Sequence, residues 1–298
     1  MHLAGGESTL SDADGRYHFQ NVSGAITVTA TAPYYVPQTI EVTVDADRTL
    51  DFDLEHLPTA EGASRGVWTS PDILDSADPT SLRSVSYAGR GVRGFWDTRA
   101  QTWVRISVYL FNVRYFGREV EFQVHPELGS RAAAQAVTDT YAPILGRIPA
   151  VLLSELDQIE LSLGTGGLRA SNGEKGIIHI PTSGGDRHVD DGFMEEMLIH
   201  EGTHVSLDPT HRDSPGWRMA QQADEVFINE YARDYPDRED IAESFLAYFI
   251  VAYRPERVNE SILNALRNAI PNRLAYFEEL GLDMSPYRKV GAIVPTGS

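Results

Sequence analysis

Residues 193–206 read Phe-Met-Glu-Glu-Met-Leu-Ile-His-Glu-Gly-Thr-His-Val-Ser and contain the pattern His200-Glu201-Gly202-Thr203-His204. Asp190-Asp191-Gly192 offers a helix start, and apolar residues at helical spacing predict that the histidines face inward. Side chains four residues apart lie on one helix face, with Cβ atoms about 5–6 Å apart. Two imidazoles placed in this way can both reach one metal ion at about 2.0–2.1 Å. The sequence therefore predicts a metal-binding helix at the centre of the fold.

The glutamate between the two histidines has its own expected role in the chemistry. A carboxylate at Glu201 can take a proton from a water molecule held by the ion and pass it to a leaving group. Two histidines on a helix also occur by chance, so the surrounding sequence has to supply the rest of the site. A catalytic zinc commonly has three protein ligands and one open position. We therefore expect a third ligand elsewhere in the chain.

The third ligand is expected on a helix further along the chain. Pro236 is predicted to open this helix, on which Glu239 and Glu243 begin a stripe that is otherwise apolar. Buried acids need partners, and a metal with its histidines would supply them. His211 is a second candidate, but the compact three-histidine pattern would place that histidine one residue earlier.

The pairing of His200-Glu201-x-x-His204 with Glu239-x-x-x-Glu243 resembles the gluzincin branch of zinc metallopeptidases. The resemblance implies that Glu239 is the third Zn²⁺ ligand beside the two histidines. It also implies that Glu201 is the general base and that Glu243 hydrogen-bonds a ligand histidine and fixes its orientation. The opposite assignment, with Glu243 as the ligand, remains an alternative.

The wording around the second motif is most similar to the lethal-factor and Mlc-titration-factor type of this branch. In that type a tyrosine seven residues before the ligand glutamate faces the active site. Tyr231 precedes Glu239 by eight residues here, so Tyr235 is its nearest alternative. The resemblance implies that Tyr231 is a catalytic residue whose hydroxyl stabilises the developing oxyanion.

A short strand is predicted at Gly176-Ile177-Ile178-His179-Ile180-Pro181, followed by a loop over residues 182–188. Ile177, Ile178, His179 and Ile180 are expected to bind a polypeptide substrate by pairing with it as an additional strand. An internal position in the sheet is the alternative. The isolated histidines His125, His179 and His188 lack ligand spacing and are expected to occupy hydrogen-bonded structural or surface positions.

The composition excludes several classes of partner. The chain has 298 residues, a formal net charge of −18 and a pI of about 4.8, and no basic patch that could neutralise phosphates, so we expect no nucleic-acid partner. Cysteine is absent, which excludes disulfides and a thiol nucleophile. No apolar run is long enough for a transmembrane segment, and no signal peptide is recognisable in this chain. The sequence gives no oligomeric state.

The first 56 residues follow a different pattern from the rest. Residues 17–19, 25–30, 39–44 and 50–54 alternate apolar and polar side chains, which predicts antiparallel strands. The wording Asp12-x-Asp14-Gly15-x-Tyr17-x-Phe19 resembles the latter part of the carboxypeptidase-regulatory-like, transthyretin-like β-sandwich. A β appendage without a ligand is favoured over a carbohydrate-binding role.

We therefore predict an α+β protein with three segments: a partial β module (1–56), a linker and ordered loop (57–90), and a zincin-like metallopeptidase domain (91–298). The last is expected to have a mixed-sheet upper lobe, the active-site helix and a helical lower lobe. Strands are expected at 103–115, 120–124 and 159–163, and helices at 130–145, 258–270 and 272–280. The favoured function is a secreted or periplasmic zinc endopeptidase. A zinc hydrolase of a non-peptide amide or ester, or a catalytically silent zincin-fold binding protein, is the alternative.

Overall fold

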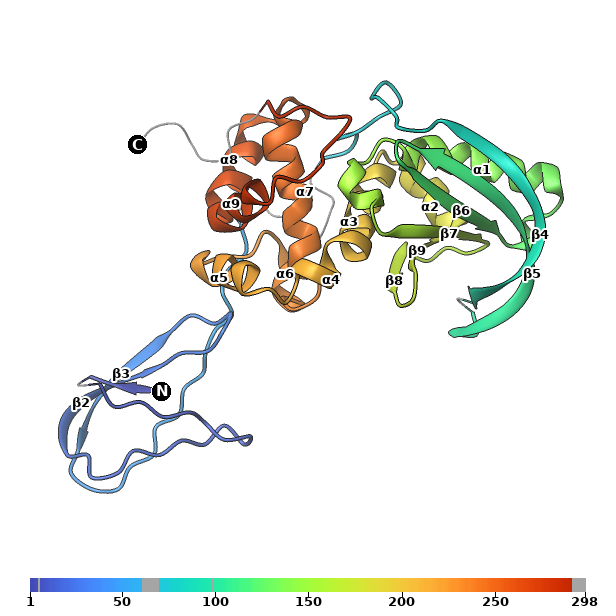
Figure 1. Ribbon diagram of the computed structural model, residues 1–298. Coiled ribbons are helices and arrows are strands. Elements are labelled where there is room, and N and C mark those ends of the chain that lie inside the picture. Colours follow the sequence, from blue (N-terminus) through green and yellow to red (C-terminus); the bar gives the residue numbers. More distant parts are fainter. Residues whose placement is uncertain (5, 61–69, 98, 291–298) are drawn as a thin grey trace. The chain divides into compact units, whose positions relative to one another are not determined.

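The computed structural model describes residues 1–4, 6–60, 70–97 and 99–290 (Figure 1). The chain divides into two compact units, Met1–Pro58 and Thr59–Ser298. The described residues form a mixed α/β structure, with a three-stranded antiparallel sheet in the first unit and a six-stranded mixed sheet with helices in the second.

The first unit is a small sheet in the order β1–β2–β3 (His2–Leu3, Gly24–Ala30, Gln38–Val44). The β2–β3 register runs from Gly24 opposite Val44 to Ala30 opposite Gln38. The strands predicted at 25–30 and 39–44 are therefore confirmed. Those predicted at 17–19 and 50–54 are wrong, because these segments meet through side chains instead of a ladder: the Tyr17 hydroxyl donates to the Leu50 carbonyl at 2.9 Å.

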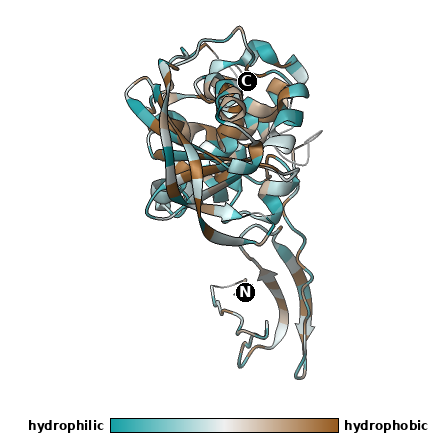
Figure 2. Cartoon of the chain, turned by 90° about the vertical axis from the view of Figure 1, so that its right-hand side faces the viewer, coloured by the Kyte–Doolittle hydropathy of each residue, from teal (hydrophilic) through white to brown (hydrophobic). Residues whose placement is uncertain are grey.

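The larger sheet has the order β4–β5–β6–β7–β9–β8. Strands β4, β5 and β6 are antiparallel, β6, β7 and β9 run parallel, and β8 is antiparallel to β9 and lies at the edge. The strands expected in the second unit form as β5, β6, β7 and β9, with small differences at their ends, whereas β4 and β8 were not expected. The bounds are β4 Ser84–Asp97, β5 Thr102–Tyr115, β6 Arg118–Val124, β7 Leu156–Ser162, β8 Arg169–Asn172 and β9 Gly176–Pro181. Figure 2 shows hydrophobic and hydrophilic segments alternating along the curved strands.

Part of the expected linker is in fact strand. Residues 84–90 belong to β4, an edge strand of the sheet, and their burial alternates as expected for a strand with one buried face. Residues 61–69 of the same expected linker lie outside the described residues. The polar and glycine-rich composition of this stretch had obscured its period of two.

Helices fill the rest of the second unit. Helix α1 begins where the Ser130 side chain accepts from the Ala133 N–H, so the helix expected at 130–145 is confirmed. Helices α8 and α9 correspond to those expected near the C-terminal end. The helices are α1 Arg131–Leu145, α2 Thr182–Asp190, α3 Met194–Ser206, α4 Asp208–His211, α5 Pro215–Ala223, α6 Glu230–Asp234, α7 Asp240–Tyr253, α8 Glu260–Ala269 and α9 Pro271–Glu279, with 3-10 turns η1 Pro126–Leu128, η2 Ala150–Leu153 and η3 Pro255–Arg257.

Two helix boundaries differ from the sequence prediction. Residues 182–188 form α2 instead of a loop, because Gly184 and Gly185 pack where a Cβ would collide with the Gly166 carbonyl and the Tyr141 hydroxyl. Their glycines mark close packing and not a turn. Pro236 does not open a helix either: residues 236–239 form turns, and α7 begins at Asp240.

The core that supports the site lies between α3 and α7. All residues of α7 from Asp240 to Ala252 are buried, and α3 packs against α7 and against the sheet (Figure 1). Within the described parts of the chain, no helix has the length and apolarity needed to cross a bilayer.

Candidate metal centre

Helix α3 carries the histidines into the interior. Glu195, in its first turn, lies 2.6 Å from Arg147 Nη1 and is placed at the positive end of the helix dipole, which favours a carboxylate. Gly202 lies beside Leu152 of η2, whose Cβ is 3.0 Å from where a Cβ on residue 202 would stand, so a larger residue would push the helix away. This close contact sets α3 at a fixed distance from η2. His200 and Glu201 are 5 % and 6 % exposed, so the motif faces inward as its spacing predicts.

Three side chains from α3 and the start of α7 converge. His200 Nε2 and His204 Nε2 are 3.1 Å apart, and Glu239 Oε2 lies 3.3 Å from the former and 3.0 Å from the latter. Four ligands placed tetrahedrally about 2.0–2.1 Å from one ion would be separated by about 3.3–3.4 Å. The three atoms thus have the spacing of ligands that share an ion, and His200, His204 and Glu239 form a buried group that can hold a metal.

Each imidazole also meets a carboxylate on its other side. Glu243 Oε1 lies 3.2 Å from His200 Nδ1, and Asp208 Oδ2 lies 2.9 Å from His204 Nδ1. Such partners fix the ring orientation and leave Nε2 to face the ion. Glu239 thus belongs to the group that can hold a metal, and Glu243 lies behind His200.

Asp208 was missed in the sequence analysis. It opens α4 and is 7 % exposed. The signal was available, because Asp208 follows His204 by four residues and therefore lies on the same helical face. His211, the alternative ligand, is not part of the group; its Nδ1 lies 2.8 Å from the Tyr276 hydroxyl.

Burial and hydrogen bonding both shift the pKa values of the residues in this group. Burial disfavours the charged form of His204, but hydrogen bonds to Asp208 and Glu239 outweigh it and raise its pKa to about 9. Burial likewise opposes the ionised form of Glu239, yet the two imidazoles hold its pKa far below the usual range. The site therefore favours an ionised carboxylate beside positive charge, which a divalent cation would supply.

Glu201 is held by the neighbouring edge strand. Its Oε2 accepts from the Ala170 N–H of β8 at 2.5 Å. The Asn172 side chain of the same strand donates to the His204 carbonyl, also at 2.5 Å. Strand β8 is thereby attached to the helix that carries the metal ligands. The sequence analysis missed this four-residue strand because it is short and mostly polar.

Tyr231 lies beside the metal group. Its ring centroid is 6.3 Å from that of His200. Burial, followed by the negative charge of Glu239, raises the pKa of Tyr231 to about 12, so its hydroxyl keeps its proton at neutral pH. The ring of Tyr235 meets that of Tyr231 edge-to-face, with centroids 5.2 Å apart, but Tyr235 is 47 % exposed and faces Arg238. Of the two tyrosines, Tyr231 is the one next to the ligands.

The strand expected at Ile177–Ile180 forms, but the prediction that it pairs with a substrate is wrong. Ile177, Ile178, His179 and Ile180 belong to β9, which pairs with β7 on one side and with β8 on the other. Both of its edges are hydrogen-bonded and all of its residues are buried, so no further strand can be added to it. The open edge of this part of the sheet is β8.

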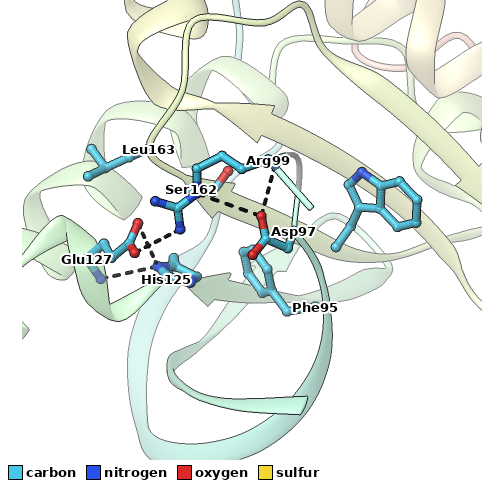
Figure 3. Close-up of a pocket in the computed structure, with 8 residues that line it drawn as sticks. Phe95, Asp97, Arg99, His125, Glu127, Ser162 and Leu163 are labelled. Carbon is cyan, nitrogen blue, oxygen red and sulfur yellow. Dashed lines mark hydrogen bonds and ion pairs between the residues drawn. The ribbon is translucent and has the colours of Figure 1, made fainter. Parts of the chain in front are cut away.

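A shallow pocket elsewhere in the second unit has different chemistry. It lies at the ends of β4, β6 and β7 and is lined in part by Asp97, Arg99, His125 and Glu127 (Figure 3). Arg99 Nη2 is 2.8 Å from Glu127 Oε1, and His125 Nδ1 accepts from the Glu127 N–H at 3.2 Å. These groups satisfy one another, and His125 has the structural role that its spacing predicted.

Comparison of the chain with protein-family models, with curated proteins and with solved structures gave no match.

Proposed function

We propose that the chain is a zinc-dependent metallopeptidase of the gluzincin type, exported from the cell that makes it. The observation that carries the proposal is the triangle formed by His200 Nε2, His204 Nε2 and Glu239 Oε2, with Glu201 on the same helix. Two histidines and one carboxylate with an open position form the donor set of catalytic zinc in thermolysin-type hydrolases. When bound, zinc supplies a Lewis acid for a carbonyl and lowers the pKa of water.

The residues around the triangle have separable roles. Glu201 accepts a proton during attack and returns it to the departing amine; its Oε2 is held by Ala170 N–H, which leaves Oε1 for this work. Tyr231 keeps its proton and donates a hydrogen bond to the oxyanion. Asp208 and Glu243 hold the imidazoles in place.

The open edge of β8 supports a polypeptide substrate over a small amide or ester. The N–H of Ala170 points away from β9, since it donates to Glu201 beside the metal group. A substrate chain paired along this edge would bring its backbone carbonyls next to Glu201. The expected strand addition is thus retained, but on β8 instead of β9.

Zinc content and cleavage test this proposal together. We expect one zinc per chain by elemental analysis after loading, and chelator-sensitive cleavage of a mixed peptide library read by mass spectrometry. Glu201→Gln should retain the zinc and lose cleavage by about a thousandfold, whereas Glu260→Gln, in the first turn of α8, should change neither. A folded chain that takes up no zinc, or a Glu201→Gln variant that still cleaves, would contradict the proposal. Cleavage of esters or small amides but of no peptide would favour the non-peptide alternative.

A further inference from the structure

A second hydrogen-bonded chain of polar residues crosses three strands of the larger sheet. Ser171 Oγ on β8 is 2.7 Å from His179 Nε2 on β9, and His179 Nδ1 is 2.8 Å from Glu160 Oε2 on β7. The Trp96 N–H donates to the same Glu160 oxygen at 3.0 Å. A hydroxyl, an imidazole and a carboxylate are therefore joined in sequence by short contacts.

This chain is separate from the metal group. A Cβ at Gly176 would meet Val205 of α3, so Gly176, Ile178 and Ile180 face that helix. Side chains alternate along a strand, and His179 therefore points to the opposite face of the sheet. The register places Glu160 and Arg169 beside His179, and Ser171, two residues from Arg169, lies on that same face.

The hydrogen-bond partners of Ser171, His179 and Glu160 determine which of their atoms carries each proton. Glu160 Oε2 accepts from Trp96 N–H and is the natural acceptor for a proton on His179 Nδ1. With Nδ1 protonated, Nε2 of the neutral ring has a lone pair, which accepts the Ser171 hydroxyl proton. This is the arrangement that activates a serine: the base is hydrogen-bonded to the nucleophile and oriented by an acid.

The three hydrogen-bonded residues differ in exposure in the way that a serine nucleophile with a buried base requires. His179 and Glu160 are 4 % and 1 % exposed, and the edge of the Trp103 ring covers His179 at a centroid distance of 5.7 Å. Ser171 is half-buried and lies on the edge strand. The base and its acid are thus shielded from water, whereas the serine lies at the edge of the sheet, beside the open side of β8.

The same edge offers a donor for a developing oxyanion. Since the Ala170 N–H points away from β9, and since the hydrogen-bonding direction alternates along a strand, the Asn172 N–H points outward as well. It belongs to the residue that follows Ser171. The Ala170 N–H is already bound to Glu201, which leaves the Asn172 N–H as the donor beside the serine.

We propose that Ser171, His179 and Glu160 form a second reactive centre, a serine nucleophile with its base and orienting acid, which cleaves carboxylic esters. Ser171 Oγ attacks the ester carbonyl carbon while His179 Nε2 takes the hydroxyl proton and gives it to the departing alcohol. The acyl group remains on Oγ until a water molecule, deprotonated by His179, releases it as a carboxylic acid and restores the hydroxyl. Overall, one ester and one water molecule are converted to a carboxylic acid and an alcohol.

A fluorophosphonate probe tests the centre directly, because Oγ–P bond formation with loss of fluoride needs the same activated hydroxyl. We expect the wild-type chain to form an adduct that peptide mass mapping places on Ser171. Ser171→Ala should abolish the adduct, and His179→Gln and Glu160→Gln should slow its formation, the former by about a hundredfold or more. Ser86 is a matched control: it lies on β4 but donates to the Asn112 carbonyl, so it should remain unlabelled.

The outcome is independent of zinc and of peptide cleavage. An adduct on Ser171 that needs His179 supports the centre whether or not the metal site is active. Absence of an adduct on Ser171 in folded wild-type protein overturns the proposal and leaves the three residues as a link between β8, β9 and β7. Labelling that is equally fast in a folded His179→Gln variant overturns it too, because the serine would then need no base.

Discussion

Two consecutive acids, one just before α7 and one at its first residue, meet different surroundings. Glu239, at the start of α7, faces the imidazoles of His200 and His204. Asp240, the next residue, is fully buried and lies 2.9 Å from Arg273 Nε; it also accepts from the Gln221 side chain. Asp224 completes this second group with a contact of 3.2 Å to Arg273 Nη1.

The difference lies in the partner charge. A guanidinium is always protonated, so Asp240 and Asp224 have a permanent counter-charge within the protein. Glu239 Oε1 also meets a guanidinium, Arg238 Nε at 2.6 Å, but that side chain is 59 % exposed. Glu239 Oε2 faces the two imidazoles, which are neutral or charged according to pH and can also bind a metal. Asp240 is thus paired wholly within the interior, whereas Glu239 keeps one oxygen among groups that can hold a cation, and this contrast adds to the motif in favouring a metal site.

Removing the ligand acid should have the largest effect. In Glu239→Gln the negatively charged ligand is lost, and we expect zinc affinity to fall by at least about a thousandfold, on the order of 4 kcal/mol. Competition titration with a coloured chelator measures it. The fold should persist, as shown by an unchanged far-UV spectrum of the zinc-free protein. Zinc affinity within threefold of the wild type would contradict the assignment of Glu239.

Breaking the permanent pair should destabilise the protein while leaving His200, His204 and Glu239 intact. Arg273→Leu leaves Asp224 and Asp240 buried without a counter-charge, so we expect the free energy of unfolding to fall by about 3–5 kcal/mol. Urea denaturation of zinc-free protein checks this. Arg105→Leu, at an exposed position of β5, is a control for loss of an arginine, with a much smaller effect expected. If the Arg273 variant were as stable as the wild type, the ion pair would have no structural role.

An intermediate loss is expected from the acid behind His204. Asp208→Asn keeps the size of the side chain but removes the charge that fixes the imidazole, and zinc affinity should fall by about ten- to a hundredfold. The same chelator titration applies. Asp213→Asn, in the exposed turn that follows, is the matched control and should bind zinc as the wild type does. Equal losses in both variants would show a general charge effect instead of ring orientation.

The smallest effect, counted per unit of pH, concerns an acid with neither kind of partner. Glu196 on α3 accepts from the Ile73 N–H at 2.8 Å, and burial raises its pKa to about 8. A raised pKa favours the protonated folded state, so its contribution is full below about pH 4.3, the usual glutamate pKa, and is lost as pH rises through 8. The slope is at most about 1.4 kcal/mol per pH unit. Urea midpoints across this range should show a decline that Glu196→Gln flattens; an unchanged slope would contradict it.

The sequence predicted long periodic elements well and short or crowded ones poorly. The strand expected at 103–115 forms as Thr102–Tyr115, because fourteen residues carry enough periodicity to decide. The helix at 182–190 was read as a loop, since its glycines are required by contacts with Gly166 and Tyr141 that no local pattern reveals. Tertiary packing, and not propensity, determined that segment.

For the candidate site, spacing along one helix was informative and pairing across strands was not. The i, i+4 relation brought His200 and His204 together, and Glu239 joined them through a motif. The order of β8 and β9 could not be read from either strand alone, so the open edge was assigned to Ile177–Ile180 instead of Arg169–Asn172. Ser171 and Glu160 carry no sequence signal at all, because they meet His179 only once three strands are aligned.

Glu239 and Asp240 are adjacent in the sequence, but the first belongs to the group that can hold a metal and the second to a buried ion pair. A helix turns by about 100° per residue, so these neighbouring acids point in different directions, and a residue inserted between them would move one of them away from its partners. The spacing of Glu239 and Asp240 is therefore constrained, and a substitution at the exposed Asp237 should be accepted more readily than an insertion or deletion next to it.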